Sequence, residues 1–229
     1  MKRWTLFVLP ALFACTQSVE STDVRTSGVY PEFQVMADGT GSSTASARLK
    51  VGGNDSNTFL DLRGSDVLEV SAGGDTQRLT SGGDHRYSAR FPVDEAGTEF
   101  VFSFRRGEQD DGAVHSAVTL PEPFELQMGS SEASRATDQV SFLWDPPAGG
   151  ELHWDLTGDC IWTEQGSTPD DGSNTLNRDD VRSVGSEPKS CTARLEVQRS
   201  HSGSIDAAFT EGGENKAYQV RAQSFTSLP

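Results

Sequence analysis

The chain of 229 residues lacks the signatures of several large protein classes. The apolar run at residues 4–12 is far shorter than the ~20 residues that a bilayer span requires. Only three cysteines are present, and no Cys-x-x-Cys, His-Glu-x-x-His or Gly-x-Ser-x-Gly pattern occurs. These absences disfavour the redox, zinc-peptidase and serine-hydrolase chemistries that use such patterns. We therefore expect a protein that is not an enzyme and that carries no cofactor.

Basic residues are also scarce. Lys and Arg number 19 against 34 Asp and Glu, so the formal net charge is -15 at pH 7, and it becomes -17 if Lys2 and Arg3 are removed with an N-terminal leader. Such a chain has no basic field with which to displace counterions from phosphates, so nucleic acid is not an expected partner. The acidity is typical of an exported protein that must stay soluble.

Long stretches of helical period are missing too. The 23 glycines and 10 prolines divide the chain into short apolar segments bounded by turn-forming residues. Many of these segments alternate apolar and polar side chains, most clearly Phe100, Phe102 and Phe104, which is the period of a half-buried strand. The pattern predicts an all-β fold of two tandem antiparallel β-sandwich domains.

The N-terminus has the features of an export signal. Two basic residues, the apolar run and small Ala14 predict a secretory signal peptide over residues 1–14. Leu12, Ala14 and Cys15 resemble the lipobox of bacterial lipoproteins, although Phe13 replaces its usual small residue. The resemblance implies that Cys15 is acylated, for example with palmitate, and anchors the chain to a membrane. Thr16, in place of the aspartate that retains many lipoproteins in the inner membrane, implies the outer membrane. An ordinary secretory cleavage site is the alternative.

The remaining cysteines and the prolines organise the rest of the chain. If Cys15 is acylated, Cys160 and Cys191 are left as a disulfide pair in an oxidising compartment. Residues 15–29 are polar without alternation and are predicted to be a flexible tether. Pro121 and Pro123 cannot donate ladder hydrogen bonds, so we place the boundary there. The predicted domains are residues 30–120 and residues 121–229.

Two segments of the second half resemble a known family. Val140, Phe142 and Trp144 share one strand face and lead through a proline pair into the aromatic strand 152–156, like the B and C strands of fibronectin type III domains. Residues 217–222 resemble the F strand of that family. The resemblance implies a sandwich, whereas the detailed topology is not carried over. For the first half the resemblance is to immunoglobulin-like sandwiches in general.

The polar segment 162–189, between the paired cysteines, is the main candidate for a functional site, because long loops in compact domains are often functional. Asp170, Asp171, Asp179 and Asp180 are candidates for a calcium site, although their spacing fits no EF-hand. Plain Asp-Gly turns are the alternative reading. Trp162, Asp170 and Asp171 are the candidate contacts for a partner.

The sequence thus predicts a lipid-anchored cell-envelope protein that acts as a non-enzymatic binding, presentation or spacer module. Its expected partners are the membrane, through the anchor, and an envelope or surface protein. A hydrolase or other enzyme on a β-sandwich scaffold and a calcium-dependent adhesion module remain the alternatives. A fold supports many functions, so the resemblances decide among none of these.

Overall fold

The computed structural model describes residues 17–107, 111–185 and 189–229. The predicted signal peptide, Cys15 and Thr16 lie outside the described residues. The strands are β1 (Gln17–Glu20), β2 (Val29–Ala37), β3 (Ser43–Val51), β4 (Thr58–Asp61), β5 (Val67–Ala72), β6 (Asp75–Arg78), β7 (Thr80–Gly83), β8 (Arg86–Phe91), β9 (Glu99–Arg105), β10 (Ala113–Thr119), β11 (Glu125–Met128), β12 (Glu132–Ser134), β13 (Val140–Asp145), β14 (Glu151–Thr157), β15 (Glu164–Pro169), β16 (Ser173–Leu176), β17 (Cys191–Ser202) and β18 (Glu214–Leu228), and the 3₁₀ helices are η1 (Ser21–Asp23), η2 (Thr26–Gly28) and η3 (Arg178–Asp180). Among the described residues, no helix is long and apolar enough to cross a bilayer.

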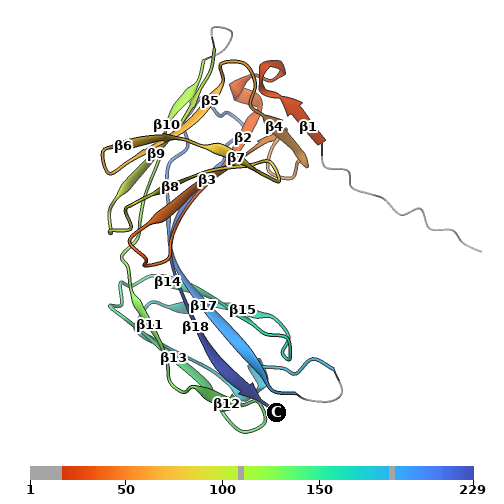
Figure 1. The fold of residues 1–229 in the computed structure, drawn as a ribbon, viewed down its shortest axis with the longest axis vertical. Helices are drawn as coiled ribbons and strands as arrows, with labels where there is room; N and C mark the ends of the chain where they lie inside the picture. The colour runs from red at the N-terminus through yellow and green to blue at the C-terminus, as the bar shows by residue number, and fades with distance from the viewer. Residues whose placement is uncertain (1–16, 108–110, 186–188) are drawn as a thin grey trace, which may run out of the picture.

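The strands form two lobes that lie one above the other along the long axis of the molecule (Figure 1). In the first lobe, a sheet containing β2, β3 and β8 faces a second sheet in the order β10-β9-β5-β6. Phe100, Phe102 and Phe104 of β9 are fully buried between the two layers. Phe102 stacks on Phe33 of the opposite sheet with ring centroids 4.4 Å apart. The predicted alternation therefore holds, and each buried phenylalanine contributes about 1.5–3 kcal/mol to folding.

The second lobe is also a two-layer sandwich. The sheet β11-β13-β16 covers the strands β18, β17, β14 and β15, and the two layers enclose a separate apolar core. Phe142 and Trp144 of β13 and Leu152 and Leu156 of β14 point into it, as their spacing predicts. The predicted all-β class is confirmed. The sheets are not purely antiparallel, however, because β1 pairs with β4, β12 with β18, and β18 with β2 in parallel.

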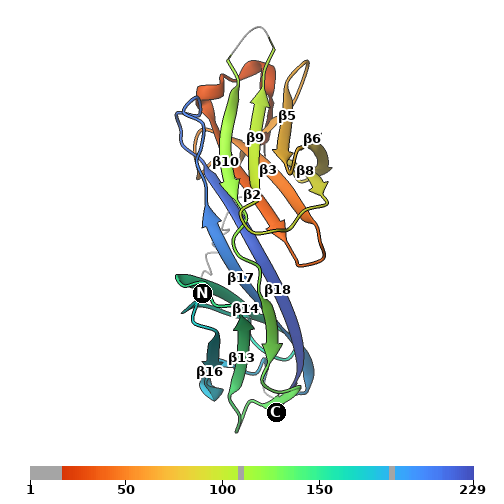
Figure 2. The same cartoon turned by 90° about the vertical axis from the view of Figure 1, so that its left-hand side faces the viewer.

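One hairpin, formed by β17 and β18, belongs to both lobes (Figure 2). Its two strands pair without a register break from Cys191 opposite Ser227 to Ser202 opposite Lys216. Near its tip, the first residues of β18 pair in parallel with β2 of the first lobe, whereas its last residues pair with β12 of the second. At about 3.3 Å per residue, β18 spans about 50 Å. A single hydrogen-bonded sheet therefore runs through the whole molecule.

The hairpin corrects the predicted domain boundaries. A division at residues 120 and 121 assigns residues 203–219 to the second domain, whereas Phe209 and Ala217 are buried in the first core. The carboxylate of Asp206, in the same segment, accepts hydrogen bonds of 2.9 and 2.8 Å from the main-chain nitrogens of Val114 and His115 in β10. The chain thus returns to the first lobe, where Phe209 completes the core and the first residues of β18 add a parallel strand to the sheet.

The predicted tether is also wrong from residue 17 onward. Strand β1 pairs with β4, and Ser21 and Thr26 are buried. The Ser21 hydroxyl accepts a hydrogen bond of 2.9 Å from the main-chain nitrogen of Arg63. The Thr26 hydroxyl donates one of 2.6 Å to the main-chain carbonyl of Asp111. Short hydroxyl side chains that are buried through hydrogen bonds leave no apolar pattern, which explains why the segment reads as flexible.

The assignment of the fibronectin-like strands needs one correction. Residues 217–222, which resemble the F strand, lie in β18, the last strand of the chain. The penultimate strand is β17, and it lies between β14 and β18 in the sheet. The segment that resembles the F strand is therefore the middle of the last described strand, which continues to Leu228, and does not precede a separate final strand.

Cys160 and Cys191 form the predicted disulfide, with Cα atoms 5.7 Å apart. It closes a loop of 31 residues, so replacing both cysteines by alanine should lower the free energy of unfolding by about 2–4 kcal/mol. Urea denaturation followed by far-UV circular dichroism measures the change. Thiol titration of the denatured chain should find neither cysteine free, and two reactive thiols would refute the bond.

Candidate functional site

Asp170, the first predicted candidate, is buried in the joint between the lobes. Its carboxylate receives two hydrogen bonds from Arg199, of 2.7 Å from Nε and 2.9 Å from Nη2, and one of 2.7 Å from the indole of Trp144. Arg199 is itself buried, donates to the carbonyls of Glu122 and Pro146, and lies over the ring of Phe124. This arrangement fixes the connection between the lobes and uses both carboxylate oxygens.

Charge at the joint is consistent with that structural role. Burial by itself would raise the pKa of Asp170, but the hydrogen bonds from Arg199 and Trp144 and the charge of Arg199 outweigh it, and the pKa is lowered. Asp170 therefore remains an anion that is matched by a buried cation. The Asp170 side chain is fully buried, and three hydrogen bonds from Arg199 and Trp144 hold its carboxylate in the interior.

The other acidic candidates lie at separate places. The carboxylate of Asp180 accepts a hydrogen bond of 2.8 Å from the Asn177 nitrogen and caps η3, whereas Asp179 is almost fully exposed. Asp171 lies at the turn before β16, where its contact with the Ser173 nitrogen is 3.5 Å. In the described part of the chain, no group of three or more His, Cys, Asp or Glu is placed to hold a metal ion. The proposed calcium loop is thus two strands and a capped turn.

Trp162 is a predicted candidate that is exposed to solvent, as is Asp171. The side chain of Trp162 is 56% exposed, and its main-chain nitrogen donates a hydrogen bond of 2.9 Å to the Arg182 carbonyl. The exposed side chain of Val184 lies in the facing segment, and the main-chain nitrogen of Val184 donates a hydrogen bond to the Cys160 carbonyl. The disulfide therefore holds the base of a small exposed apolar area at the second lobe.

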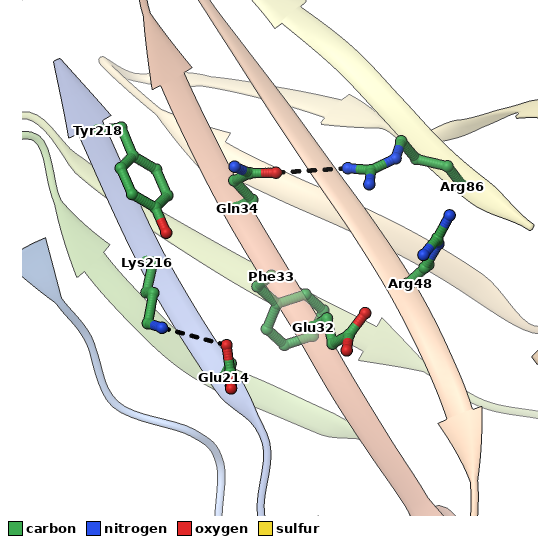
Figure 3. Close-up of a pocket in the computed structure, with 8 residues that line it drawn as sticks. All are labelled: Glu32, Phe33, Gln34, Arg48, Arg86, Glu214, Lys216 and Tyr218. Carbon is green, nitrogen blue, oxygen red and sulfur yellow. Dashed lines mark hydrogen bonds and ion pairs between the residues drawn. The ribbon is translucent and has the colours of Figure 1, made fainter. Parts of the chain in front are cut away.

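A polar depression of about 170 Å³ lies on the outer face of the larger sheet of the first lobe. Figure 3 shows side chains from four neighbouring strands around it. They are Glu32 and Gln34 of β2, Arg48 of β3, Arg86 of β8, and Lys216 and Tyr218 of β18. Strand alternation places them there, because the residues between them point into the first core.

The charges in this depression are unevenly paired. Glu32 is 2.6 Å from the Lys50 ammonium, and Glu214 is 3.3 Å from that of Lys216. The hydrogen bond and the charge of Glu214 raise the pKa of Lys216. Both lysines thus have a carboxylate partner. Arg86 bonds only to uncharged oxygens, those of Ser46 at 3.0 Å and Gln34 at 3.4 Å, among the described residues.

Sequence reasoning did not find this depression, because its residues come from four separate stretches of the chain. Arg48 and Arg86 are 38 positions apart in the sequence, and β18 follows 128 residues after Arg86. Each of these residues, taken alone, is typical of a polar position on the solvent-facing side of an alternating strand. Only the pairing of β3 with β8 and of β2 with β18 brings them together.

No protein-family model matches the chain, and no curated protein matches it. Among solved structures, the FN1–FN3 domains of chicken CNTN1 are similar at a TM-score of 0.29 and 10% identity, covering 88% of this chain and 69% of that one. A two-domain fibronectin type III segment of chicken tenascin has a TM-score of 0.26 at 10% identity, with 87% and 99% covered. Domains A168–A170 of titin have a TM-score of 0.25 at 10% identity, with 87% and 66% covered.

Proposed function

We propose that this protein is a lipid-anchored, non-enzymatic module of the cell envelope that holds a binding surface at a fixed geometry. The observation that carries the proposal is the β17–β18 hairpin, whose strands are continuous through both lobes (Figure 2). A chain with a flexible linker would let its lobes reorient, which is the default for tandem domains. Here the shared sheet and the buried pair of Asp170 and Arg199 both oppose reorientation.

The N-terminus supports a short attachment. Gln17 already pairs with Thr58 in the first lobe, and only Thr16 separates it from Cys15. Two residue steps reach at most about 7 Å. An acyl group on Cys15 would therefore hold the first lobe next to the lipid and make the second lobe the distal one. Such an arrangement suits a spacer or a presenting arm, with exposed Trp162 on the distal lobe.

Replacing the lipid attachment site tests the anchor. Cys15→Ser should abolish incorporation of radioactive palmitate and move the protein from the membrane fraction to the soluble fraction, because the thioether-linked chains supply nearly all of the membrane affinity. Thr16→Asp is the matched control, since it leaves the acylated residue in place. That variant should stay labelled and membrane-bound.

The unfolding curve of Cys15→Ser should match that of the unaltered chain, because Cys15 precedes the first strand. Label and membrane association that persist in Cys15→Ser would refute the lipoprotein proposal.

A further inference from the structure

The depression on the first lobe contains two arginines that face each other. Strands β3 and β8 are antiparallel, and Ala47 pairs with Tyr87, so the next position of the register sets Arg48 opposite Arg86. Both side chains line the depression, and Figure 3 shows them on the same side of it, with Arg86 extended toward Gln34. Like charges at directly opposite positions of a sheet destabilise it. The pairing of Arg48 with Arg86 is therefore not explained by its contribution to stability.

No carboxylate of the depression is left to neutralise the pair. Glu32, the register partner of Arg48, is held by Lys50, and Glu214 is held by Lys216. Among the described residues, the Arg48 side chain has no ion pair and no hydrogen bond, and its Nε is buried without a partner. A buried donor that is left unsatisfied costs about 1–3 kcal/mol. Arg48 thus carries both an uncompensated charge and an unused donor.

Arg48 is nevertheless held in place. Its guanidinium carbon lies 5.4 Å from the ring centre of Phe59, and the imidazole of His85 stacks on the same phenylalanine at 5.0 Å with the planes 6° apart. His85 also approaches Asp61, with 3.4 Å between Nδ1 and Oδ1. Asp61 and Asp84 line the adjoining depression, which Arg48 borders as well. The aromatic contact orients Arg48 without using its N–H donors.

We propose that Arg48 and Arg86 form a binding subsite for an oxyanion, either a phosphate or a carboxylate group of a ligand that occupies the depression. Each guanidinium is a planar fork of N–H donors that matches the paired oxygens of such a group. One anion between them would be attracted by both charges and would accept hydrogen bonds from the terminal N–H groups of the two guanidinium groups. The amide of Gln34 and the hydroxyl of Tyr218 line the same depression and offer further polar contacts.

The overall charge of -15 affects which anions this subsite can bind. An acidic chain repels all small anions at long range, so affinity has to come from short-range hydrogen bonds. Chloride cannot accept the paired, in-plane hydrogen bonds that a carboxylate or phosphate accepts. The subsite should therefore distinguish oxyanions from chloride at equal ionic strength. It involves the first lobe alone and does not depend on the membrane anchor.

Thermal unfolding of the purified full chain tests the subsite, with inorganic phosphate, malonate or chloride at matched ionic strength. Phosphate or malonate at roughly ten times its dissociation constant should raise Tm by about 3–5 °C over chloride. A larger rise with phosphate identifies a phosphate group as the preferred ligand, and a larger rise with malonate identifies a carboxylate.

Arg48→Gln and Arg86→Gln should each abolish the oxyanion-dependent rise. In chloride alone, both variants should melt at or above the Tm of the unaltered chain, because the like-charge contact is gone. Arg90→Gln, four positions after Arg86 on β8 and hydrogen-bonded to Ser42, is the matched control and should keep the full rise. In ¹⁵N spectra, the arginine Nε–H signal that disappears in Arg48→Gln should shift on addition of the oxyanion.

Three results would overturn the proposal. The first is a Tm in phosphate and malonate equal to that in chloride. The second is a rise that survives in Arg48→Gln and Arg86→Gln, which would place the binding elsewhere. The third is an Arg48 Nε–H signal that does not respond to either anion.

Discussion

Asp170→Ala should lower the free energy of unfolding by about 3–5 kcal/mol. The substitution removes the carboxylate that meets Arg199 through two hydrogen bonds, and it leaves that guanidinium buried with only carbonyl oxygens around it. It also deprives the Trp144 indole of its acceptor. Urea denaturation measures the loss. Asp179→Ala, on an almost fully exposed side chain, is the matched control and should change stability by less than about 0.5 kcal/mol.

The same substitution should alter the acid dependence of stability. The pKa of Asp170 is lowered in the folded protein, so this group adds stability that is fully present above its unfolded pKa of about 3.9. That contribution is lost as the pH falls through the folded pKa. The stability difference between the unaltered chain and Asp170→Ala should therefore shrink below pH 4. A difference no larger than that of Asp179→Ala, or one independent of pH, would contradict the structural role of the pair.

Phe209→Ala should destabilise the first lobe by about 3–5 kcal/mol, although residue 209 lies 20 positions from the C-terminus. The ring is buried in the first core, 6.1 Å from that of Phe33 and 6.4 Å from that of Phe104. Removing it leaves a cavity between the two layers. Amide hydrogen exchange should show the loss of protection first in β2 and β9.

Glu211→Ala, on an exposed residue of the same connection, controls for effects on the connection itself and should leave exchange in β2 and β9 unchanged. Loss of protection confined to the second lobe in Phe209→Ala would contradict the shared architecture. It would instead favour two domains that divide near residue 120.

The sequence was most informative where one local pattern decides the structure. Three phenylalanines at alternate positions 100, 102 and 104 can share only one face of a strand, and the structure buries all three. The disulfide could also be predicted, because the lipobox resemblance implies an acylated Cys15 and so leaves Cys160 and Cys191 to pair. In both cases the information lies in a few residues and needs no knowledge of distant contacts.

The features that could not be predicted from the sequence depend on contacts between residues that are far apart in the chain. Asp170 at an Asp-Asp-Gly turn reads equally as a solvated turn or a cation ligand, and only Arg199, 29 residues later, makes it a buried ion pair. Phe209 is a single aromatic residue in a polar segment, so no periodicity marks it as core. Arg48 and Arg86 become neighbours only through strand pairing. Long-range register, rather than local propensity, decided each of these positions.

The distance between the lobes tests the central claim of a fixed two-lobe scaffold most directly. Spin labels at Ser81→Cys on β7 and Ser167→Cys on β15, both exposed, would report it by double electron–electron resonance in a Cys15→Ser background. The continuous β17–β18 hairpin predicts one narrow distance distribution that does not change with ionic strength. A broad or multimodal distribution would show that the lobes reorient and would contradict the account.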